Sequence, residues 1–546
     1  MRPPEDFLTL LRAWQRDDPD KVVITGYDVA GQRNGAQPLG RSTLTVAQLW
    51  RQVLAMGAAL RRLGVAQGDV VAIQLPTWHE YFVAHLAAYA AGAVTMPISP
   101  IYRTRDVARQ IELGTVKVLF VPAVFAGFDY IAMGRELRAS GGSLRHVVAV
   151  GGTGEGALAW DDLLRDGAAD PQARLVGEGR FVPPVDAFML LNFTSGTTGV
   201  PKGVMHSVKT ISAAIHGASD RMGVGAADVI LIAVTIGHAA GFLNGVYMPL
   251  LRRARALYLD AWNPGIVLQV VERERATYAP MMPTFLFDLV RHERFAATDL
   301  SSLRRARVSG GAISRPVMSA LQERLPDWQL FPGWGMSEGL YMTCGGPADP
   351  LDKRNQTDGR PLENVRLEIR DKTFSHCLPA GQRGEMVVKA DSVMLGYYRQ
   401  PELTAAAMTA DGFLKTGDVG LIDEAGYLVM VGRSKDIVVR GGENVPIVEV
   451  ENLLMEHPLV EIACVVGVPD ERLGEKVCAV IRSRRPEEQL TLEEMRRFLI
   501  GRELTRQFMP ELLVHFTELP LTSLGKVKRN ELRQRVLDHL ALPLPD

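Results

Sequence analysis

Residues 193–203 read FTSGTTGVPKG and combine three glycines, four hydroxyl side chains and one lysine in a short stretch. Glycine lets backbone N–H groups approach phosphate oxygens closely, and the hydroxyl groups add further donors. The apolar run 188–193 indicates a buried strand that delivers this loop. A Walker phosphate loop is excluded, because Pro201 precedes Lys202 and Gly203 follows it. The stretch predicts a polyphosphate-binding loop, with a flexible Gly/Thr linker as its alternative.

The composition indicates an enzyme-sized chain of more than one domain. At 546 residues, a large domain and at least one smaller one are expected. The 61 Lys and Arg residues against 62 Asp and Glu residues give a net charge of -1, so no basic field indicates nucleic acid or an anionic membrane as a partner. The four cysteines lack C-x-x-C spacing, and the N-terminal MRPPEDF lacks the apolar core of a signal peptide. These features predict a cytoplasmic location.

Short apolar runs alternate with longer helical patterns, which predicts an α/β fold with largely parallel sheets. We expect strands at 70–75, 118–121, 146–150 and 230–235, and a helix at 81–91. Residues 81–102 carry no charge, but a histidine, a glycine and two prolines interrupt them. They therefore predict a buried helix and a short strand, and no transmembrane segment. Around 381–398, strand-like segments such as 384–388 suggest a small β-rich layer.

The residues after 433 have the pattern of a compact α+β unit of about a hundred residues, a size that suits an independent small domain. We expect strands at 437–440, 462–468 and 476–481, and helices at 447–456 and 492–499. The short, charged junction 432–437 (GRSKDI) is predicted to be a hinge, although an ordinary turn between strands fits its pattern equally well. The predicted domains are 1–434 and 435–546.

Two further motifs suit a nucleotide. Residues 333–338 (GWGMSE) predict a tight loop in which Trp334 stacks on a flat ring and Glu338 faces a metal ion. A core tryptophan and a solvated glutamate are the alternative. Residues 309–312 (SGGA) lack bulk after a short strand, which lets a planar group lie against the backbone.

Two more segments are less specific. The sequence Thr416-Gly417-Asp418 is predicted to lie in a turn before a strand at 419–422, where Asp418 would accept hydrogen bonds from a ribose diol or simply belong to a common turn pair. Residues 520–529 (PLTSLGKVKR) place Lys526 after a glycine in a predicted loop, where lysines are usually solvated. Metal-ligand spacing of His and Cys and a G-x-S-x-G elbow are both missing from the sequence, so metal and serine hydrolysis have no support.

In sequence and in order, these motifs resemble the series of the adenylate-forming superfamily of acyl- and aryl-CoA synthetases, nonribosomal adenylation domains and luciferases. The series is the loop at 194, GHAAGF at 237, SGGA at 309, GWGMSE at 333, TGD at 416, GRSKD at 432, RGGEN at 440 and PLTSLGK at 520. The resemblance spans essentially the whole chain, which is most similar to medium-chain and cyclohexanecarboxylate-type acyl-CoA ligases. It implies a large N-terminal domain of two α/β subdomains and a β-barrel-like layer, with a small mobile α+β C-terminal domain.

The resemblance implies an ATP-dependent carboxylic acid:CoA ligase that uses ATP, Mg²⁺ and coenzyme A. The acid attacks the α-phosphate, pyrophosphate leaves, and the acyl-adenylate passes its acyl group to a thiol. One alternative is transfer to a carrier protein or a separate thioester ligase. Another is a non-catalytic nucleotide-binding protein, which is disfavoured because every residue expected to carry chemistry is present. The sequence leaves open whether the chain forms a homodimer.

Residue roles are likewise implied by the resemblance. The implied catalytic residues are Lys526, which bridges the carboxylate and the α-phosphate, His238, Ser337, and Glu338, which binds Mg²⁺. The implied nucleotide, hinge and CoA-tunnel residues are Thr194, Ser195, Gly196, Thr197, Thr198, Gly199, Lys202, Gly310, Gly311, Ala312, Trp334, Gly335, Met336, Asp418, Arg433, Lys435, Gly441 and Gly442. The implied acid pocket consists of His238, Ala239, Ala240, Gly241, Phe242, Trp334 and Met336.

Three small residues after His238 leave volume in the implied pocket, which favours a medium-chain, alicyclic or polycyclic acid over acetate. Close packing of a helix is the alternative explanation for these small residues. The amino-acid-activating branch usually carries an Asp within the segment 236–238, and its absence here argues against an α-ammonium substrate. Many relatives have Tyr and Thr in place of Trp334 and Ser337, replacements that preserve the ring and the hydroxyl.

Overall fold

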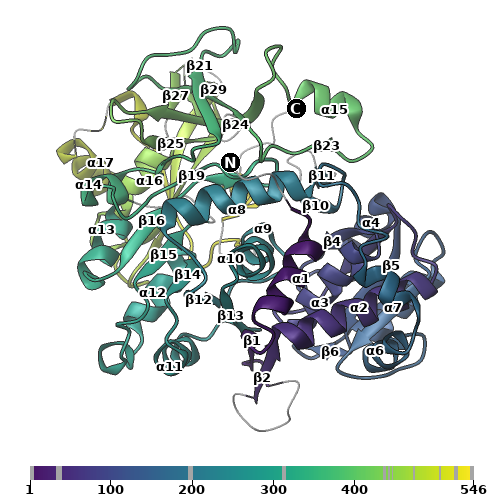
Figure 1. Ribbon diagram of the computed structural model, residues 1–546. Coiled ribbons are helices and arrows are strands. Elements are labelled where there is room, and N and C mark those ends of the chain that lie inside the picture. The colour runs from purple at the N-terminus through teal and green to yellow at the C-terminus, as the bar shows by residue number, and fades with distance from the viewer. Residues whose placement is uncertain are drawn as a thin grey trace.

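Two large sheets form the body of the molecule (Figure 1). The computed structural model describes residues 5–31, 40–194, 201–309, 315–433, 438–440, 443–445, 447–470, 474–502, 504, 506–521 and 527–540. The first sheet is seven-stranded and parallel except for its last strand, in the order β16 (Gln329–Pro332), β15 (Arg305–Val308), β14 (Tyr278–Met281), β12 (Val229–Ile232), β13 (Arg255–Leu259), β1 (Val22–Asp28), β2 (Gly40–Thr45).

The second sheet is eight-stranded and mixed. Its order is β23 (Gly396–Tyr397), β11 (Lys202–His206), β10 (Leu190–Thr194), β4 (Val94–Pro97), β3 (Val70–Ile73), β5 (Val116–Pro122), β8 (His146–Val150), β9 (Leu158–Ala159). The strands from β10 to β9 are parallel, whereas β11 is antiparallel to both of its neighbours. The carboxyl end of β10 therefore leads directly into the 193–203 loop.

Helices cover both sheets, as expected for an α/β protein. One apolar cluster fills the space between the first sheet and α11 (Pro264–Glu274), α12 (Pro283–Arg291) and α13 (Arg315–Arg324). Another lies between the second sheet and α4 (Thr104–Gly114) and α5 (Tyr130–Ala139). The largest core joins the inner faces of both sheets through α1 (Phe7–Asp17), α2 (Val46–Arg62), α3 (His79–Ala90), α6 (Trp160–Ala168), α7 (Gln172–Gly177), α8 (Val208–Met222) and α10 (Met248–Arg252).

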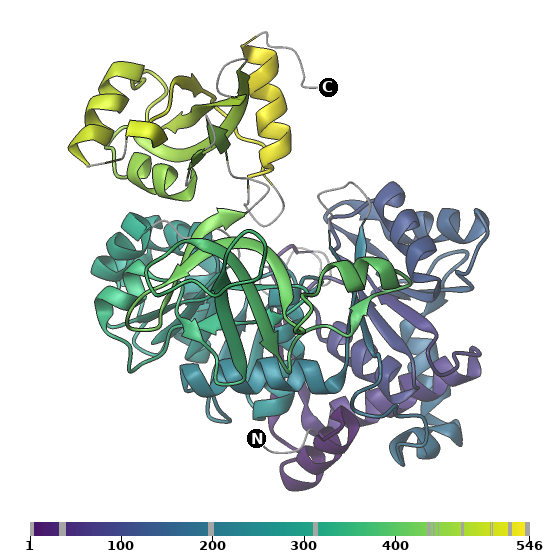
Figure 2. The same ribbon diagram turned by 90° about the horizontal axis from the view of Figure 1, so that it is seen from above.

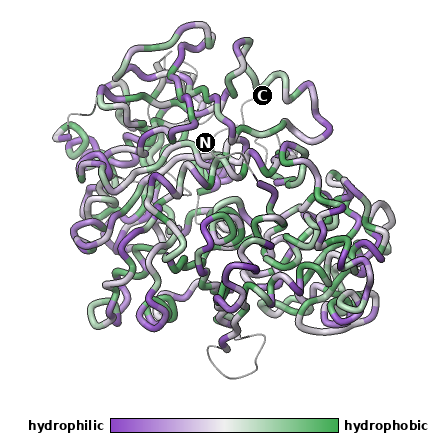
Figure 3. Tube along the Cα trace, in the orientation of Figure 1, coloured by the Kyte–Doolittle hydropathy of each residue, from purple (hydrophilic) through white to green (hydrophobic). Residues whose placement is uncertain are grey.

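The uncharged segment 81–102 is a buried helix followed by a buried strand, as predicted. In helix α3, 11 of the 12 residues are buried, Glu80 and His85 among them, so the helix lies in the core on all sides, and β4 follows it into the second sheet. Among the described helices, none combines the length and hydrophobicity that a membrane span requires. Green hydrophobic stretches recur along the strands and helices, and purple hydrophilic stretches gather at the outer turns (Figure 3).

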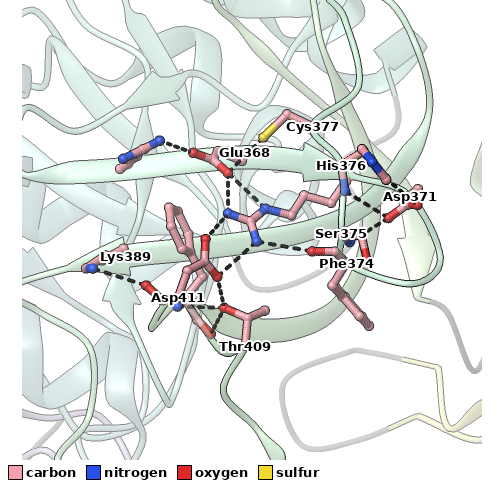
Figure 4. A network of polar contacts seen from close by, with 12 residues as sticks. Glu368, Asp371, Phe374, Ser375, His376, Cys377, Lys389, Thr409 and Asp411 are labelled. Carbon is pink, nitrogen blue, oxygen red and sulfur yellow. Dashed lines mark hydrogen bonds and ion pairs between the residues drawn. The ribbon is translucent and has the colours of Figure 1, made fainter.

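The β-rich layer is a four-stranded antiparallel sheet in the order β21 (Val365–Arg370), β22 (Gly384–Ala390), β24 (Leu414–Ile422), β25 (Leu428–Arg433). Arg370, the last residue of β21, donates to Glu368 Oε2 in the same strand at 2.6 Å and to Asp411 Oδ2 before β24 at 2.7 Å (Figure 4). The turn 371–376 closes over the same guanidinium, since Arg370 Nη1 also donates to the Phe374 carbonyl at 3.2 Å. Helix α14 (Leu351–Gln356) precedes this layer in the sequence, and α15 (Pro401–Ala406) lies between β22 and β24.

The C-terminal residues form a smaller α+β unit, seen apart from the large body in Figure 2. Its sheet has the order β27 (Glu443–Val445), β26 (Val438–Arg440), β29 (Gly474–Ser483), β28 (Val460–Asp470), with β30 (Leu512–His515) parallel to β29. Helices α16 (Ile447–Met455), α17 (Leu492–Gly501) and α18 (Arg529–His539) pack on it. The α/β class with a large N-terminal and a smaller C-terminal domain is thus confirmed. The predicted boundary at 434/435 lies outside the described residues.

One local prediction was wrong. Residues 416–418 do not form a turn before a strand but lie within β24, where Met386 alone faces all three of them. Such a bulge bends the strand and turns a side chain out of the regular alternation. Gly417 makes this geometry accessible, because its φ of 70° lies in the region that favours glycine.

Candidate active site

The candidate motifs of the first sheet lie along one of its edges. Strands β12, β14, β15 and β16 run parallel, so their carboxyl ends meet there. The chain leaves these ends into residues 233–238, into SGGA and into GWGMSE. Ligands of open α/β sheets bind outside this edge. Gly310, Gly311 and Ala312 lie outside the described residues.

A small hairpin presents Ser337 and Glu338. Strand β17 (Gly335–Met336) pairs with β18 (Leu340–Tyr341), and the Gly339 N–H donates to the Met336 carbonyl at 3.2 Å. Leu340 adopts a left-handed backbone conformation with φ 60°, which brings the chain straight back. Ser337 and Glu338 therefore lie in the turn, half-buried.

Trp334 and Asp418 contact each other directly. The Trp334 indole Nε1–H donates to Asp418 Oδ2 at 2.9 Å, and both side chains are buried. The bulge in β24 is fixed by Thr416, whose hydroxyl donates to the Met386 carbonyl and accepts from the Asp418 N–H at 3.0 Å. The residue proposed for adenine and the one proposed for ribose thus come from different layers and are joined by one hydrogen bond. Arg433 pairs with Asp418 along the backbone, and its side chain is not described.

The ends of the 193–203 loop are held side by side. Thr194 at the end of β10 is the ladder partner of Lys202 at the start of β11. The Lys202 ammonium lies 5.2 Å from the centre of the Tyr397 ring, within the range of a cation–π interaction. Ser195, Gly196, Thr197, Thr198 and Gly199 lie outside the described residues.

Glu338 has a specific partner. The Tyr397 hydroxyl donates to Glu338 Oε1 at 2.9 Å, and the Met394 N–H donates to the Glu338 backbone carbonyl at 2.7 Å. Burial and the neighbouring carboxylate raise the pKa of Tyr397, so this hydroxyl remains a donor.

Glu338 and Lys202 fit an Mg²⁺ ion that is bound together with a nucleotide. Magnesium is usually held by one or two carboxylates and by substrate phosphates. Within the described part of the chain, no three His, Cys, Asp or Glu side chains form a metal cluster. A single half-buried carboxylate, which shares Tyr397 as a neighbour with Lys202, therefore suits an ion bound by the nucleotide better than an independent metal centre.

His206 joins the hairpin to the second sheet. Its Nε2 lies 2.7 Å from the Ser337 carbonyl, and burial lowers the pKa of its imidazole to about 4. The ring is neutral at pH 7, so Nε2–H is the donor. The next residue, Ser207, caps α8 in a reciprocal capping box with Thr210, which fixes His206 at the helix entrance.

The small residues of GHAAGF divide into two kinds. An added Cβ at Gly241 would lie 2.1 Å from the Thr235 carbonyl oxygen, so close packing explains this residue. Ala239 and Ala240, in α9 (Ala239–Phe242), are half-buried, as is His238 before them. Phe242 is fully buried and makes an edge contact with Tyr247, so it belongs to the core.

Sequence reasoning missed three residues around the hairpin: His206, Tyr397 and Arg307. The Arg307 guanidinium is buried, stacks 4.1 Å from the Tyr341 ring centre and donates to Ser309 Oγ at 2.8 Å. The only local sign of these residues was a polar side chain within a strand-like run, and such a sign does not reveal a partner far away in the chain. Lys526, Lys435, Gly441 and Gly442 lie outside the described residues, so their roles stay predictions.

The hairpin thus bonds to the second sheet through His206 and Tyr397, and Trp334 before it bonds to the β layer. The family model of AMP-binding enzymes matches residues 11–398, and the model of the AMP-binding enzyme C-terminal domain matches 449–526. The chain belongs to the AMP-binding enzyme family. The motif order had indicated this family, the adenylate-forming superfamily, and the expectation of an enzyme is confirmed.

Several relatives of this AMP-binding enzyme carry ligase names. The chain is 33% identical over 532 residues to the medium-chain fatty-acid–CoA ligase of Escherichia coli (strain K12), and the match covers 96% of this chain and 90% of that protein. It is 32% identical over 502 residues to the 3-[(3aS,4S,7aS)-7a-methyl-1,5-dioxo-octahydro-1H-inden-4-yl]propanoyl:CoA ligase of Rhodococcus jostii (strain RHA1), covering 91% and 94%. The crystal structure of ATP-bound MatB from Rhodopseudomonas palustris superposes with a TM-score of 0.84 at 25% identity, covering 97% of this chain and 99% of that one.

Proposed function

We propose that this AMP-binding enzyme is an AMP-forming carboxylic acid:CoA ligase that acts on an apolar medium-chain, alicyclic or polycyclic acid. The observation that carries the proposal is the hairpin 335–341. It is hydrogen-bonded to the second sheet through Ser337 and Glu338, and Glu338 contacts Tyr397, whose ring lies against Lys202. Trp334, just before the hairpin, is hydrogen-bonded to Asp418 of the β layer. The names of the relatives support CoA as the acceptor and a medium-sized apolar acid as the substrate.

In this proposal each described residue has a separate task. Trp334 offers a flat surface to adenine, and Asp418 accepts from the ribose hydroxyls. Lys202 supplies positive charge to the β- and γ-phosphates, and the residues after Thr194 donate hydrogen bonds to them, while Glu338 holds Mg²⁺, which supplies charge neutralisation when it is bound. In-line attack at phosphorus depends mainly on such positioning and on countercharge.

The C-terminal unit supplies the remaining tasks. Lys526 is proposed to join the acid carboxylate to the α-phosphate, Lys435 to be the hinge, and Gly441 and Gly442 to line the path of the pantetheine arm. A lysine on a movable domain suits two successive half-reactions, because it must be present for adenylation and must leave before a thiol can enter. We keep 434/435 as the proposed boundary.

One experiment tests the function. The wild-type enzyme is incubated with ATP, Mg²⁺, hydroxylamine and a panel of acids from acetate to bicyclic acids, and hydroxamate and AMP are measured. Medium-chain or cyclic acids should give both products in equal amounts. Replacing hydroxylamine by free CoA or by a pantetheinylated carrier protein then identifies the acceptor. A Lys526→Ala variant is the matched control and should lose roughly a hundredfold or more in adenylation. AMP formation only with acetate or an amino acid would contradict the proposal.

The acid pocket gives the first variant prediction. Ala240 is half-buried, so Ala240→Phe should fill space that a longer acid would occupy. Because each buried methylene is worth about 0.8 kcal/mol, or roughly fourfold in affinity, the preference should move toward acids shorter by two or more carbons by about tenfold. The measurement is kcat/KM across the acid panel, with the KM for ATP changed less than threefold. Ala405→Phe, at an exposed position of α15, is the control. An unchanged preference among the acids in Ala240→Phe would show that this segment does not line the acid pocket.

A further inference from the structure

Residues 394–398 form a bridging segment between the two halves of the candidate site. The Met394 N–H donates to the Glu338 carbonyl at 2.7 Å, so this end is fixed to the hairpin. The Leu395 N–H donates to the Met205 carbonyl at 2.9 Å, and the Tyr398 N–H donates to the Gly203 carbonyl at 2.7 Å. The bridging segment is thereby hydrogen-bonded to the strand that leaves the 193–203 loop and to the turn that carries Glu338.

Tyr397 is the one residue of this segment that touches both proposed phosphate-site charges. Its hydroxyl donates to Glu338 Oε1 at 2.9 Å, and its ring lies 5.2 Å from the Lys202 ammonium. Tyr397 is itself only 6% exposed, so its ring has little freedom to move. Among the described residues, no other side chain hydrogen-bonds to the Glu338 carboxylate.

Glu338 and Lys202 do not pair with each other, although both lie against the same tyrosine. No nitrogen–oxygen contact within 4.0 Å joins them in the described structure. A direct ion pair would use up the countercharge that a triphosphate and its metal ion need. The phenol separates the two charges and gives each a different interaction, a hydrogen bond for the anion and a π-face for the cation.

We propose that Tyr397 is a positioning residue for nucleotide-bound Mg²⁺. Its hydroxyl orients the Glu338 carboxylate for the metal ion, and its ring orients Lys202 for the phosphates. The inference rests on the proposed function, because it takes Glu338 as the metal ligand. Hydrogen-bonding partners of a metal ligand typically contribute 10- to 100-fold to metal affinity or activity.

The test uses binding rather than turnover. Isothermal titration measures the affinity of the full-length enzyme for α,β-methylene-ATP with Mg²⁺ and with EDTA, and the ratio of the two affinities reports the contribution of the metal. In Tyr397→Phe, which keeps the ring, this ratio should fall about tenfold while the affinity in EDTA changes less than twofold. In Tyr397→Leu, which also removes the ring, the affinity in EDTA should fall a further two- to fivefold.

The neighbouring tyrosine gives a matched control. The Tyr398 hydroxyl lies 3.3 Å from Thr115 Oγ1 and away from Glu338, so Tyr398→Phe should leave the metal-dependent ratio unchanged. Melting temperatures within about 2 °C of wild type would show that these variants are folded. A Tyr397→Phe ratio equal to that of wild type would overturn the proposal, as would an equal drop in Tyr398→Phe. A wild-type enzyme that does not bind the analogue at all would instead overturn the proposed function.

Discussion

His206 illustrates how a single buried side chain couples stability to pH at this site. The imidazole, at the end of β11, is fully buried and lies against the Ser337 carbonyl, and burial lowers its pKa from 6.5 to about 4. In the unfolded chain the ring binds a proton below pH 6.5, whereas in the folded protein it does so only near pH 4. The contribution of His206 to the free energy of unfolding is therefore fully present above pH 6.5, and about 3 kcal/mol of it is lost as the pH falls toward 4.

The prediction is a change in the slope of stability against pH. His206→Gln keeps a side-chain N–H donor but cannot titrate, so its free energy of unfolding should fall by about 3 kcal/mol less than that of wild type between pH 7 and pH 4. Urea unfolding followed by tryptophan fluorescence at several pH values measures this difference. His85 is a second buried histidine, with its pKa lowered to about 3, and it keeps its acid sensitivity in both proteins. Parallel curves for the two proteins would contradict the assignment.

At the residue scale, sequence reasoning found the motif residues but not their partners. Trp334, Glu338 and Asp418 were proposed because glycines and turn residues surround them, and such chemistry is local. Tyr397 and His206 contact that group from positions about 60 and 130 residues away in the chain, as the separations to Glu338 and Ser337 show. Nothing in a short window indicates a contact that only the sheet order creates. The roles of Lys526 and the other residues outside the described part of the chain stay predictions.

At the scale of elements, the Arg370 network ties the first strand of the β layer to the residues before β24. The guanidinium also lies 4.4 Å from the Phe413 ring centre, and it holds the pKa of Asp411 well below its ordinary value. Arg366 contacts the same Glu368 at 2.6 Å, but its side chain is 71% exposed against 8% for Arg370. The two arginines thus differ mainly in burial.

We expect Arg370→Met to lower the free energy of unfolding by about 2 kcal/mol, because it removes several charge-assisted hydrogen bonds from a buried group. Arg366→Met, the matched exposed partner, should lower it by about 0.5 kcal/mol. Asp411 has its pKa lowered in the folded state, so its contribution is present above pH 4 and is lost as the pH falls further. Thermal unfolding at pH 7 and pH 3 compares the variants, and Arg370→Met should lose less on acidification than wild type. Equal destabilisation by both variants would show that burial does not decide the effect.

Several strands were predicted from their apolar runs, and β8 was predicted at its observed bounds, 146–150. Many other elements were not predicted, among them β1, β13, β30 and α18. The apolar run around Leu512–His515 is short and lies between Glu511 and Glu518, and the strand pairs in parallel with β29. Helix α18 has few apolar positions, and Leu532, Val536 and Leu537 alone are buried. The bulge at 416–418 was misassigned because Gly-Asp is typical of turns as well as of bulges.

At the scale of the whole molecule, two ion pairs join the small C-terminal unit to the large one within the described residues. Arg383 before β22 pairs with Glu449 of α16 at 2.7 Å, and Arg291 of α12 approaches Glu461 of β28 at 3.8 Å. All four side chains are partly exposed. Such ion pairs are worth a fraction of a kilocalorie to about 1 kcal/mol, so they bias an arrangement of the two units rather than fix it.

Charge reversal should therefore shift the population of this arrangement. Arg383→Glu should reduce it by roughly two- to fivefold, because it replaces attraction to Glu449 by repulsion. The double variant Arg383→Glu with Glu449→Arg should restore it. Distances between one spin label in each unit, measured in a Cys377→Ser background because Cys377 is exposed, report the population. If the single and the double variant gave the same distance distribution as wild type, the pair would have no influence on the arrangement.

The pairing of Thr194 with Lys202 also has a consequence for how the loop between them can vary in length. Both ends are fixed by the β10–β11 ladder, so the sheet determines where the loop begins and ends but not how many residues it contains. The entropy of closing a flexible loop grows only with the logarithm of its length, and one added residue costs the fold about 0.1 kcal/mol. Folding therefore places almost no constraint on the length of this loop. Any constraint on its length would instead come from the proposed binding of a nucleotide.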